Sequence, residues 1–503
     1  MTLQIHLRRT MGRKILVGLS VLAGTWVLLL VPLPEAEIPG NGLAASGRRA
    51  FEWAQDSIWQ ELEGRFVQAR GQGCDTLRPH ATRAFETLKE LIAATGRGQR
   101  EPSDPLFEQM EETIFETGVS IAGCPDLFAE YLRLVTDARN SMKERSRSWD
   151  MNDRMTRETM YRILYGSRAA VEEVMLQLPP KDVPGLALGI EEPSETPFAS
   201  ILGVQIHSGD ILVSRGGAPT SALIARGNDF PGNFSHVALV HVDAQTKRAS
   251  IIESHIERGV AVATVEEYLR DTKLRVMVLR LRSDLPAMQA DPHLPHRAAQ
   301  ASLDDARSRH IPYDFEMHYD EPSKLFCSEV ASAAYNTVGV RLWMGISTIS
   351  GTGLRSWLGA FGVKYFETQE PSDLEYDPQL RVVAEWRDPE TLYQDHVDNA
   401  VTEAMLEGAE RGERMCYDWY LLPLGRLMKL YSVAKNTMGD EGPVPEGMSA
   451  EAALRNRWYS QRHASARTLV MKKADAFAVS KGYRPPYWQL VQMAREALLE
   501  IPA

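Results

Sequence analysis

Cys327 combines a nucleophilic side chain with a position at the expected start of a helix. It lies in Leu325–Val330, where a charged loop gives way to the alanine-rich run 330–335. The first turn of a helix carries partial positive charge, which favours a thiolate over a thiol. We therefore predict that Cys327 is a nucleophile. The alternative is a buried structural cysteine, which is the commoner situation for this residue type.

His236 is the predicted base for this nucleophile. It opens Ser235–Val242, an apolar run that predicts a strand with the imidazole at its mouth. A cysteine and a histidine are the minimum for nucleophilic acyl transfer, because the histidine takes up the thiol proton. His241 lies five residues further on and should face the opposite side of the strand. The alternative for His236 is an ordinary core histidine satisfied by hydrogen bonds.

Glu253 is the predicted third member of the site, a polar group that orients the base. It lies in Ile251–Ser254 on the next expected strand, where a buried carboxylate would need a partner such as an imidazolium. His255 shares the face of Glu253 and is either a competing base or a residue at the rim. The alternative for Glu253 is a surface carboxylate on an edge strand.

Three stretches of different periodicity must position these side chains. Apolar residues recur at helical spacing over residues 48–180 and again from 388 onward, and a Pro/Glu-rich linker over 179–197 precedes a series of short β-branched runs. Strands grouped together with helices outside them indicate an α+β domain. The expected strands are Asp210–Val213, Ser235–Val242, Ala249–Ser254, Val260–Val262, Leu274–Leu279 and Leu380–Ala384. The expected helices are Phe51–Arg70, Thr76–Thr95, Pro105–Thr117, Pro125–Glu144, Arg154–Gln177, Pro295–Arg309, Thr391–Arg411, Met415–Lys435, Ala450–Arg457 and Tyr487–Leu499.

Composition excludes several classes of protein. With 503 residues, 44% hydrophobic and 24% charged, the chain is typical of a globular protein with roughly two to four domains. A net charge of -11 argues against a nucleic-acid partner, which would require a basic face. The chain has no His-Glu-x-x-His motif and no two pairs of closely spaced cysteines, so we expect neither a metal nor a cofactor.

The N-terminus has the pattern of a targeting segment. Arg8, Arg9, Arg13 and Lys14 precede an apolar run over 15–34, and about 20 apolar residues span a bilayer. Basic residues on the N-terminal flank favour a cytoplasmic tip. The pattern predicts a single-pass membrane protein with its bulk on the periplasmic or extracytoplasmic side. The alternative is a cleaved export signal with its cleavage site at 43–46.

The remaining cysteines give weaker signals. Cys74 and Cys124 both lie in the N-terminal helical region, and export would allow them to form a disulfide; two buried free thiols are the alternative. Cys416 lies in an aromatic-rich helical stretch and is expected in the core.

Residues 200–390 resemble the circularly permuted papain-fold cysteine hydrolases, the YiiX-like branch of the NlpC-type superfamily. In that branch the histidine precedes the cysteine, as it does here. The matching pieces, in order, are Gly209–Leu212, Ser235–Val237, Ile252–Ser254, Pro312–Asp314, Phe326–Glu329 and Glu370–Leu374 with 380–386.

This resemblance implies that Cys327 is the nucleophile, His236 the base and Glu253 the third member. It also implies an oxyanion hole that uses the backbone N–H of Cys327, and a loop over the cleft shaped by the piece at 312–314. Phe326 departs from the family pattern, because related sequences often have tyrosine there.

These observations predict four regions: a basic tip with a transmembrane signal-anchor (1–40), a helical domain with a linker (41–195), a permuted papain-like domain with an antiparallel sheet and a catalytic helix (196–390), and a C-terminal helical region (391–503). The expected function is that of a membrane-anchored, envelope-facing cysteine hydrolase, either an amidase or peptidase or a lipid acyl hydrolase, that forms a thioester acyl-enzyme. Expected partners are cell-wall peptides or lipid acyl groups as substrates, the membrane through the N-terminal helix, and envelope proteins through the helical regions. The alternative is a non-catalytic papain-like binding or scaffold protein.

Overall fold

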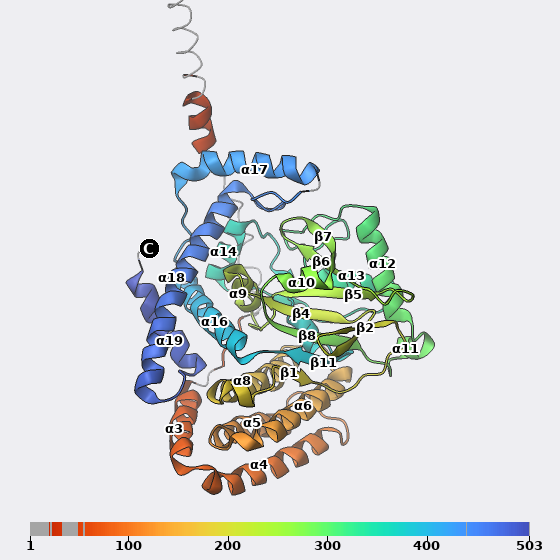
Figure 1. Ribbon diagram of the computed structural model, residues 1–503, viewed down its shortest axis with the longest axis vertical. Coiled ribbons are helices and arrows are strands. Elements are labelled where there is room, and N and C mark those ends of the chain that lie inside the picture. Colours follow the sequence, from red (N-terminus) through yellow and green to blue (C-terminus); the bar gives the residue numbers. More distant parts are fainter. Residues whose placement is uncertain (1–19, 21–22, 33–48, 54–55, 439, 502–503) are drawn as a thin grey trace, which may run out of the picture.

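A seven-stranded antiparallel sheet forms the centre of the molecule (Figure 1). The computed structural model describes residues 20, 23–32, 49–53, 56–438 and 440–501. Every pair of neighbouring strands in the sheet is antiparallel. In spatial order the strands are β1 (Leu186–Leu188), β11 (Leu380–Trp386), β8 (Lys273–Leu281), β4 (Ile211–Gly216), β5 (His236–Val242), β6 (Ala249–His255) and β7 (Gly259–Thr264).

The central strands are buried on both faces because apolar residues occupy alternate positions on each side. In β8, Met277 and Leu279 join one core, whereas Val276 and Val278 join a second core on the other face. The first core also holds residues of the N-terminal helices and of α13 (Glu329–Asn336). The second lies beneath a separate hairpin of β2 (Phe198–Ile201) and β3 (Val204–His207). The predicted α+β class with an antiparallel sheet is confirmed.

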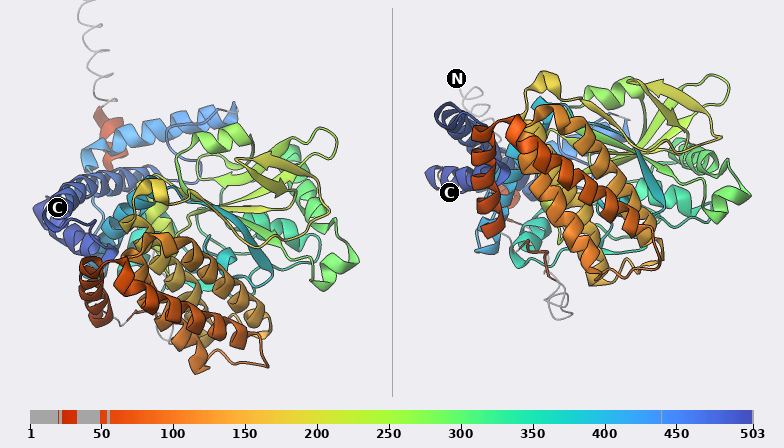
Figure 2. Two further views of the ribbon diagram at one scale, coloured as in Figure 1. Left: turned by 60° about the horizontal axis from the view of Figure 1, so that its bottom comes forward. Right: turned by 90° about the horizontal axis from the view of Figure 1, so that it is seen from below.

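Helices surround the sheet on several sides (Figures 1 and 2). The N-terminal helices lie together at one end, α12 and α13 pack on β5, and the C-terminal helices lie along a flank. The N-terminal helices are α3 (Asp56–Gln72), α4 (Cys74–Thr95), α5 (Pro105–Ala122), α6 (Phe128–Arg145), α7 (Arg154–Tyr161) and α8 (Ser167–Gln177). Those between and after the strands are α9 (Pro219–Arg226), α10 (Val265–Arg270), α11 (Pro286–Ala290), α12 (Leu294–Ser308), α14 (Thr352–Phe361), α15 (Asp373–Tyr376), α16 (Pro389–Glu410), α17 (Leu422–Thr437), α18 (Ala450–Lys481) and α19 (Tyr487–Glu500).

A buried network of charges ties the helical flanks to the sheet. Asp395 of α16 pairs with Arg215 of β4 at 3.1 Å and with Arg275 of β8 at 2.7 Å. Arg275 also pairs with Glu172 of α8 at 2.5 Å, and His396 donates to the same carboxylate. The three charged side chains centred on Asp395 are fully buried, so each depends on the others for compensation of its charge.

The prediction of an N-terminal transmembrane helix is corrected. Of the predicted span over 15–34, the structure describes residues 20 and 23–32, whereas the basic flank and the cleavage site at 43–46 lie outside the described residues. Among the residues that the structure describes, no helix has both the length and the apolar character needed to cross a bilayer. This finding also contradicts the predicted single-pass membrane localisation.

Four local predictions differ from the structure. The helix expected over 415–435 begins only at Leu422, after a 3-10 turn. The helix expected over 450–457 continues to Lys481, because its later turns bury a mixture of small, polar and apolar residues, namely Tyr459, His463, Ala466, Val470 and Ala474, which gives a weak apolar periodicity. The helix expected over 154–177 is interrupted by a π-helical turn at Arg162–Gly166. Cys416 is exposed and not part of the core.

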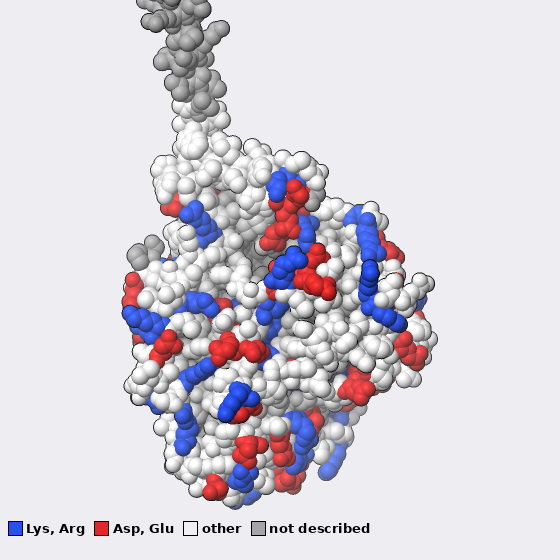
Figure 3. All heavy atoms as spheres, viewed as in Figure 1, with Lys and Arg blue, Asp and Glu red and all other residues white. Residues whose placement is uncertain are grey.

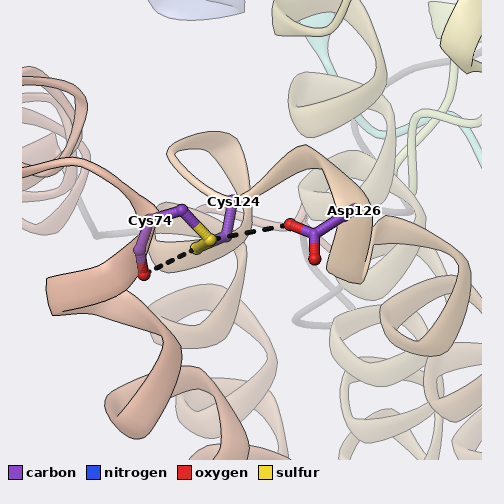
Figure 4. A group of neighbouring side chains, drawn as sticks. All are labelled: Cys74, Cys124 and Asp126. Atoms are coloured by element: carbon purple, nitrogen blue, oxygen red, sulfur yellow. Dashed lines mark hydrogen bonds between the residues drawn. A yellow bond between two sulfur atoms is a disulfide. The ribbon is translucent and has the colours of Figure 1, made fainter.

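Cys74 and Cys124 form a disulfide that joins the start of α4 to the turn before α6 (Figure 4). Asp126 lies next to this pair, so three potential metal ligands gather at one place. The two sulfur atoms are bonded to each other, which removes them as thiolate ligands. Arg78 instead binds the Asp126 carboxylate at 2.7 Å. The question that the sequence left open is answered in favour of the disulfide.

Candidate active site

His236 and Glu253 meet across neighbouring strands. Ala238 of β5 lies opposite Glu253 of β6, so the first residue of β5 lies close to the end of β6. The Nε2 atom of His236 is 2.7 Å from Oε2 of Glu253, whose side chain is 2% exposed. Burial raises the pKa of Glu253, but hydrogen bonds from two histidines outweigh this and hold the pKa well below its usual value. The pair therefore contains a carboxylate and not a carboxylic acid.

His255 is the second histidine on this carboxylate. Its Nε2 atom is 3.1 Å from Oε1 of Glu253, and its ring lies 5.7 Å from that of His236. Glu253 thus stands between two imidazoles, one on each oxygen. The sequence left His255 as a competing base or a rim residue, and the structure makes it a partner of the orienting carboxylate.

The environment of His236 favours its neutral form. Burial lowers the pKa of His236, and the nearby Lys273 and His255 lower it further, while Glu253 acts in the opposite direction. A neutral imidazole with Nε2–H directed at Glu253 carries its lone pair on Nδ1, which is the form required of a base.

Cys327 lies in the tight turn that leads into α13. The N–H of Val330 donates to the carbonyl of Cys327, and helix α13 begins at Glu329. Two serines fix the turn from either side: Ser254 Oγ donates to Leu325 O at 2.7 Å, and Ser328 Oγ donates to Gln369 O at 2.6 Å. The first of these bonds ties the turn directly to β6, one residue from Glu253.

The thiol of Cys327 touches the backbone on both sides of His236. Its Sγ atom lies 3.8 Å from Ser235 O, and the N–H of Val237 is in hydrogen-bonding reach of the sulfur. Burial raises the pKa of Cys327 to about 12, although the backbone N–H groups of Val237 and Ser328 lower it in part. The prediction that the helix start favours a thiolate is therefore wrong for the resting protein, because the cost of burying the charge exceeds the effect of the N–H groups.

The loop at 312–314 lies against the cysteine turn. Leu325 N–H donates to Pro312 O at 3.1 Å, and the carboxylate of Asp314 accepts N–H groups of Glu316 and His318. The loop is thus pinned by backbone contacts next to Cys327. Burial raises the pKa of Tyr313 well above its usual value, and the ionisable groups near it include Cys327.

Glu370 is a neighbour of the thiol that the sequence analysis did not single out. Its side chain is buried, and burial together with Asp373 and Asp229 raises its pKa well above the usual value. A negative charge on Glu370 would raise the pKa of Cys327 further. In the sequence, the only signal for Glu370 was its place in the segment 370–374 that resembles the family. Its proximity to Cys327 is a property of the tertiary fold.

The C-terminal helical region reaches the edge of this site. The loop 441–448 binds the β6–β7 turn, where Glu446 N–H donates to Glu257 O at 3.3 Å and Arg258 pairs with Glu441 at 3.0 Å. The same Glu446 carboxylate lies 2.9 Å from His310 Nε2. Cys327 is 5% exposed, whereas the imidazoles of His236 and His255 are 18% and 20% exposed. The site therefore opens to solvent at its histidines.

Residues 205–384 match the model of a family described as permuted papain-like amidases, YaeF/YiiX, the C92 family. The stretch 205–384, about a third of the chain, is therefore similar to the permuted papain-like amidases. The match includes His236, Glu253 and Cys327 and confirms the family suggested by the sequence. The domain is accordingly a papain-like cysteine hydrolase that acts on amide bonds. Neither the curated proteins nor the solved structures yield a match to the chain.

Proposed function

We propose that Cys327, His236 and Glu253 form the catalytic triad of this amidase and that the reaction passes through a thioester. The observation that carries the proposal is the 2.7 Å contact between His236 and Glu253, with the thiol of Cys327 against the backbone on either side of His236. This order of nucleophile, base and orienting carboxylate is the arrangement required for acyl transfer.

In the first half of the reaction, His236 Nδ1 accepts the Cys327 proton as the sulfur attacks the amide carbonyl. The negative charge that develops on the carbonyl oxygen is stabilised by the backbone N–H of Cys327. The C–N bond then breaks, the amine leaves with the proton from His236, and a thioester remains on the sulfur. Glu253 holds the imidazolium through Nε2–H while the charge exists.

In the second half, water replaces the amine. His236 Nδ1 removes a proton from the water as the oxygen attacks the thioester carbonyl. The C–S bond breaks, the carboxylic acid leaves, and the sulfur recovers its proton from His236. A thiol with a pKa of about 12 is a poor nucleophile by itself, so proton removal and attack must occur together at this site.

We propose a peptide amide as the substrate class, with lipid acyl groups as the second candidate. The amidase description of the family supports an amide.

A non-catalytic binding protein is the competing proposal. The low exposure and high pKa of Cys327 motivate it. The contact between His236 and Glu253 argues against it, because a binding protein has no need to bury a carboxylate on the base of a thiol.

Labelling by a thiol-directed acyl probe tests the triad. The experiment uses a Cys416→Ala background, because Cys416 is an exposed thiol that would react without any catalytic help. We expect an acyl adduct on Cys327, its loss in Cys327→Ala, and a strong decrease in His236→Ala, with intact mass measurement as the readout. Equal labelling of Cys327 in the His236→Ala variant would contradict the triad, and an adduct that never hydrolyses would contradict turnover.

A further inference from the structure

Helix α17 presents an apolar stripe to solvent. The stripe begins in the short 3-10 turn Trp419–Leu421 and continues along the helix at three- and four-residue spacing, so its members share one face. Trp419 is 65% exposed and Leu430 is 66% exposed. The principal members are Trp419, Tyr420, Leu424, Leu427, Leu430 and Tyr431.

The opposite face of α17 accounts for its attachment to the protein. Gly425 packs toward Ala450 at the start of α18, and a Cβ atom placed on Gly425 would lie 3.6 Å from the side chain of Ala450. Ser432 is fully buried and accepts the N–H of Val444 at 2.9 Å. The inner face is thus complete without the apolar stripe, which contributes nothing to the core.

The charge of α17 is opposite in sign to that of the whole chain. Arg426, Lys429 and Lys435 are its charged residues, and the helix contains no aspartate or glutamate, in a chain of net charge -11. Two of the three are engaged within the protein, because Arg426 pairs with Glu451 of α18 at 2.7 Å and Lys429 donates to the carbonyls of Pro445 and Glu446. Figure 3 shows that the end of the molecule formed by α17 is largely white, with few charged side chains across it.

A second apolar segment joins α17 on this end of the molecule. The described residues 23–32 carry no charge, and Trp26, Val27, Leu28 and Val31 are exposed. The guanidinium of Arg426 donates to Leu29 O at 3.0 Å and to Val31 O at 2.7 Å, which holds this segment against α17. The helical part of the segment rises away from the body at the same end (Figure 1).

We propose that α17 lies flat in the headgroup region of a lipid bilayer. An interfacial helix of this kind needs an apolar stripe and amphipathic aromatic rings, and α17 and its preceding turn supply both. Tryptophan and tyrosine place an apolar ring beside the acyl chains and a polar atom in the headgroups. Such a contact requires no spanning helix and places the amidase domain beside the bilayer surface.

Flotation of the full chain with lipid vesicles tests this surface. The vesicles contain phosphatidylcholine with phosphatidylglycerol, or phosphatidylcholine alone as the uncharged comparison. We expect binding to both kinds of vesicle, and a decrease of about tenfold or more in the partition coefficient of the double variant Leu427→Glu/Leu430→Glu. The matched control is Val479→Glu/Leu499→Glu, because these two residues are 89% and 88% exposed on α18 and α19, outside the stripe. Equal binding of the two double variants would overturn the proposal.

A fluorescent label separates contact by α17 from contact by residues 23–32 alone. An environment-sensitive dye is attached to Leu430→Cys or to Val479→Cys, in each case with Cys416→Ser and Cys327→Ala. Vesicles should shift the emission of the first to the blue and leave the second unchanged. Vesicle binding without a shift in the emission of the dye at position 430 overturns the proposal. Self-association of the protein without lipid overturns it as well if Leu427→Glu/Leu430→Glu abolishes that association, because the exposed face of α17 would then bind a second copy of the chain. The Leu427→Glu/Leu430→Glu variant should still be labelled at Cys327 by the acyl probe in the absence of vesicles. A negative result in the vesicle experiments therefore leaves the proposed triad untouched.

Discussion

Replacement of His236 by alanine should change how the reaction of Cys327 with an alkylating reagent depends on pH. In the wild-type protein the base removes the thiol proton during attack, so the rate should be nearly constant above the lowered pKa of His236 and should fall below it. Without the imidazole, only the free thiolate of Cys327 can react.

The size of the effect follows from the buried position of the thiol. Burial raises the pKa of Cys327 from 9.0 to about 12, which reduces the thiolate fraction near pH 8 by about a thousandfold relative to an ordinary cysteine. The rate for His236→Ala should therefore rise about tenfold for each pH unit between about pH 7 and pH 10. The alkylation rate of Cys327 in the wild type should exceed that in His236→Ala by up to about a thousandfold near pH 7 and by much less near pH 10.

The assay is iodoacetamide alkylation followed by mass spectrometry of the peptide that contains Cys327. The exposed Cys416 in the same molecule serves as an internal standard for the reagent. His241→Ala is the matched control, because His241 lies on the same strand but binds Gln300 of α12 at 2.7 Å. The assignment of His236 as the base would be refuted if the alkylation rate of Cys327 depended only weakly on pH in His236→Ala. It would also be refuted if the rate depended on pH as steeply in His241→Ala as in His236→Ala.

Three further predictions concern the groups around the site and the stability of the fold. Glu253→Gln should lower kcat/KM for amide hydrolysis by about 10²- to 10⁴-fold with the fold intact, because the carboxylate fixes the tautomer of its histidine; wild-type activity would exclude an orienting role. Asp395→Ala should lower the free energy of unfolding in urea by about 3–5 kcal/mol, since it leaves two buried arginines uncompensated, whereas Asp137→Ala at an exposed ion pair should cost less than about 1 kcal/mol. A similar cost for both variants would show that the buried network carries no special weight. Replacement of Cys74 and Cys124 by serine removes a crosslink between residues 50 apart and should cost up to about 4 kcal/mol in the same assay, with no change expected if the thiols are unpaired in the purified protein.

The strands around the site could be predicted because their signal is local. Alternation of apolar residues marks a strand within a few positions, and β5, β6 and β8 begin within one residue of the predicted bounds. The proximity of His236 and Glu253 follows from antiparallel pairing of consecutive strands, which the sequence order already favours.

Other features escaped the sequence because they depend on distant residues. The apolar aromatic stretch 415–435 predicts a core helix, yet the face of α17 that points outward carries much of that apolar character. Cys416 illustrates the same failure, because residue type cannot tell which side of a segment packs inward. Glu370 becomes a neighbour of Cys327 only through the fold, across 43 positions of chain.

The sequence by itself determined the chemical identities at this site: a thiol before a helix, a histidine at the mouth of a strand, and a carboxylate on the next strand. These depend on residue type and short-range periodicity, which a chain displays without folding. Only the tertiary structure decided their energetics. Burial of Cys327 beneath its turn reverses the expected preference for a thiolate, and His255 joins His236 on one carboxylate because residues at the ends of two strands meet in space. Solvation and proximity of this kind are set by the whole fold, and no local stretch of sequence contains them.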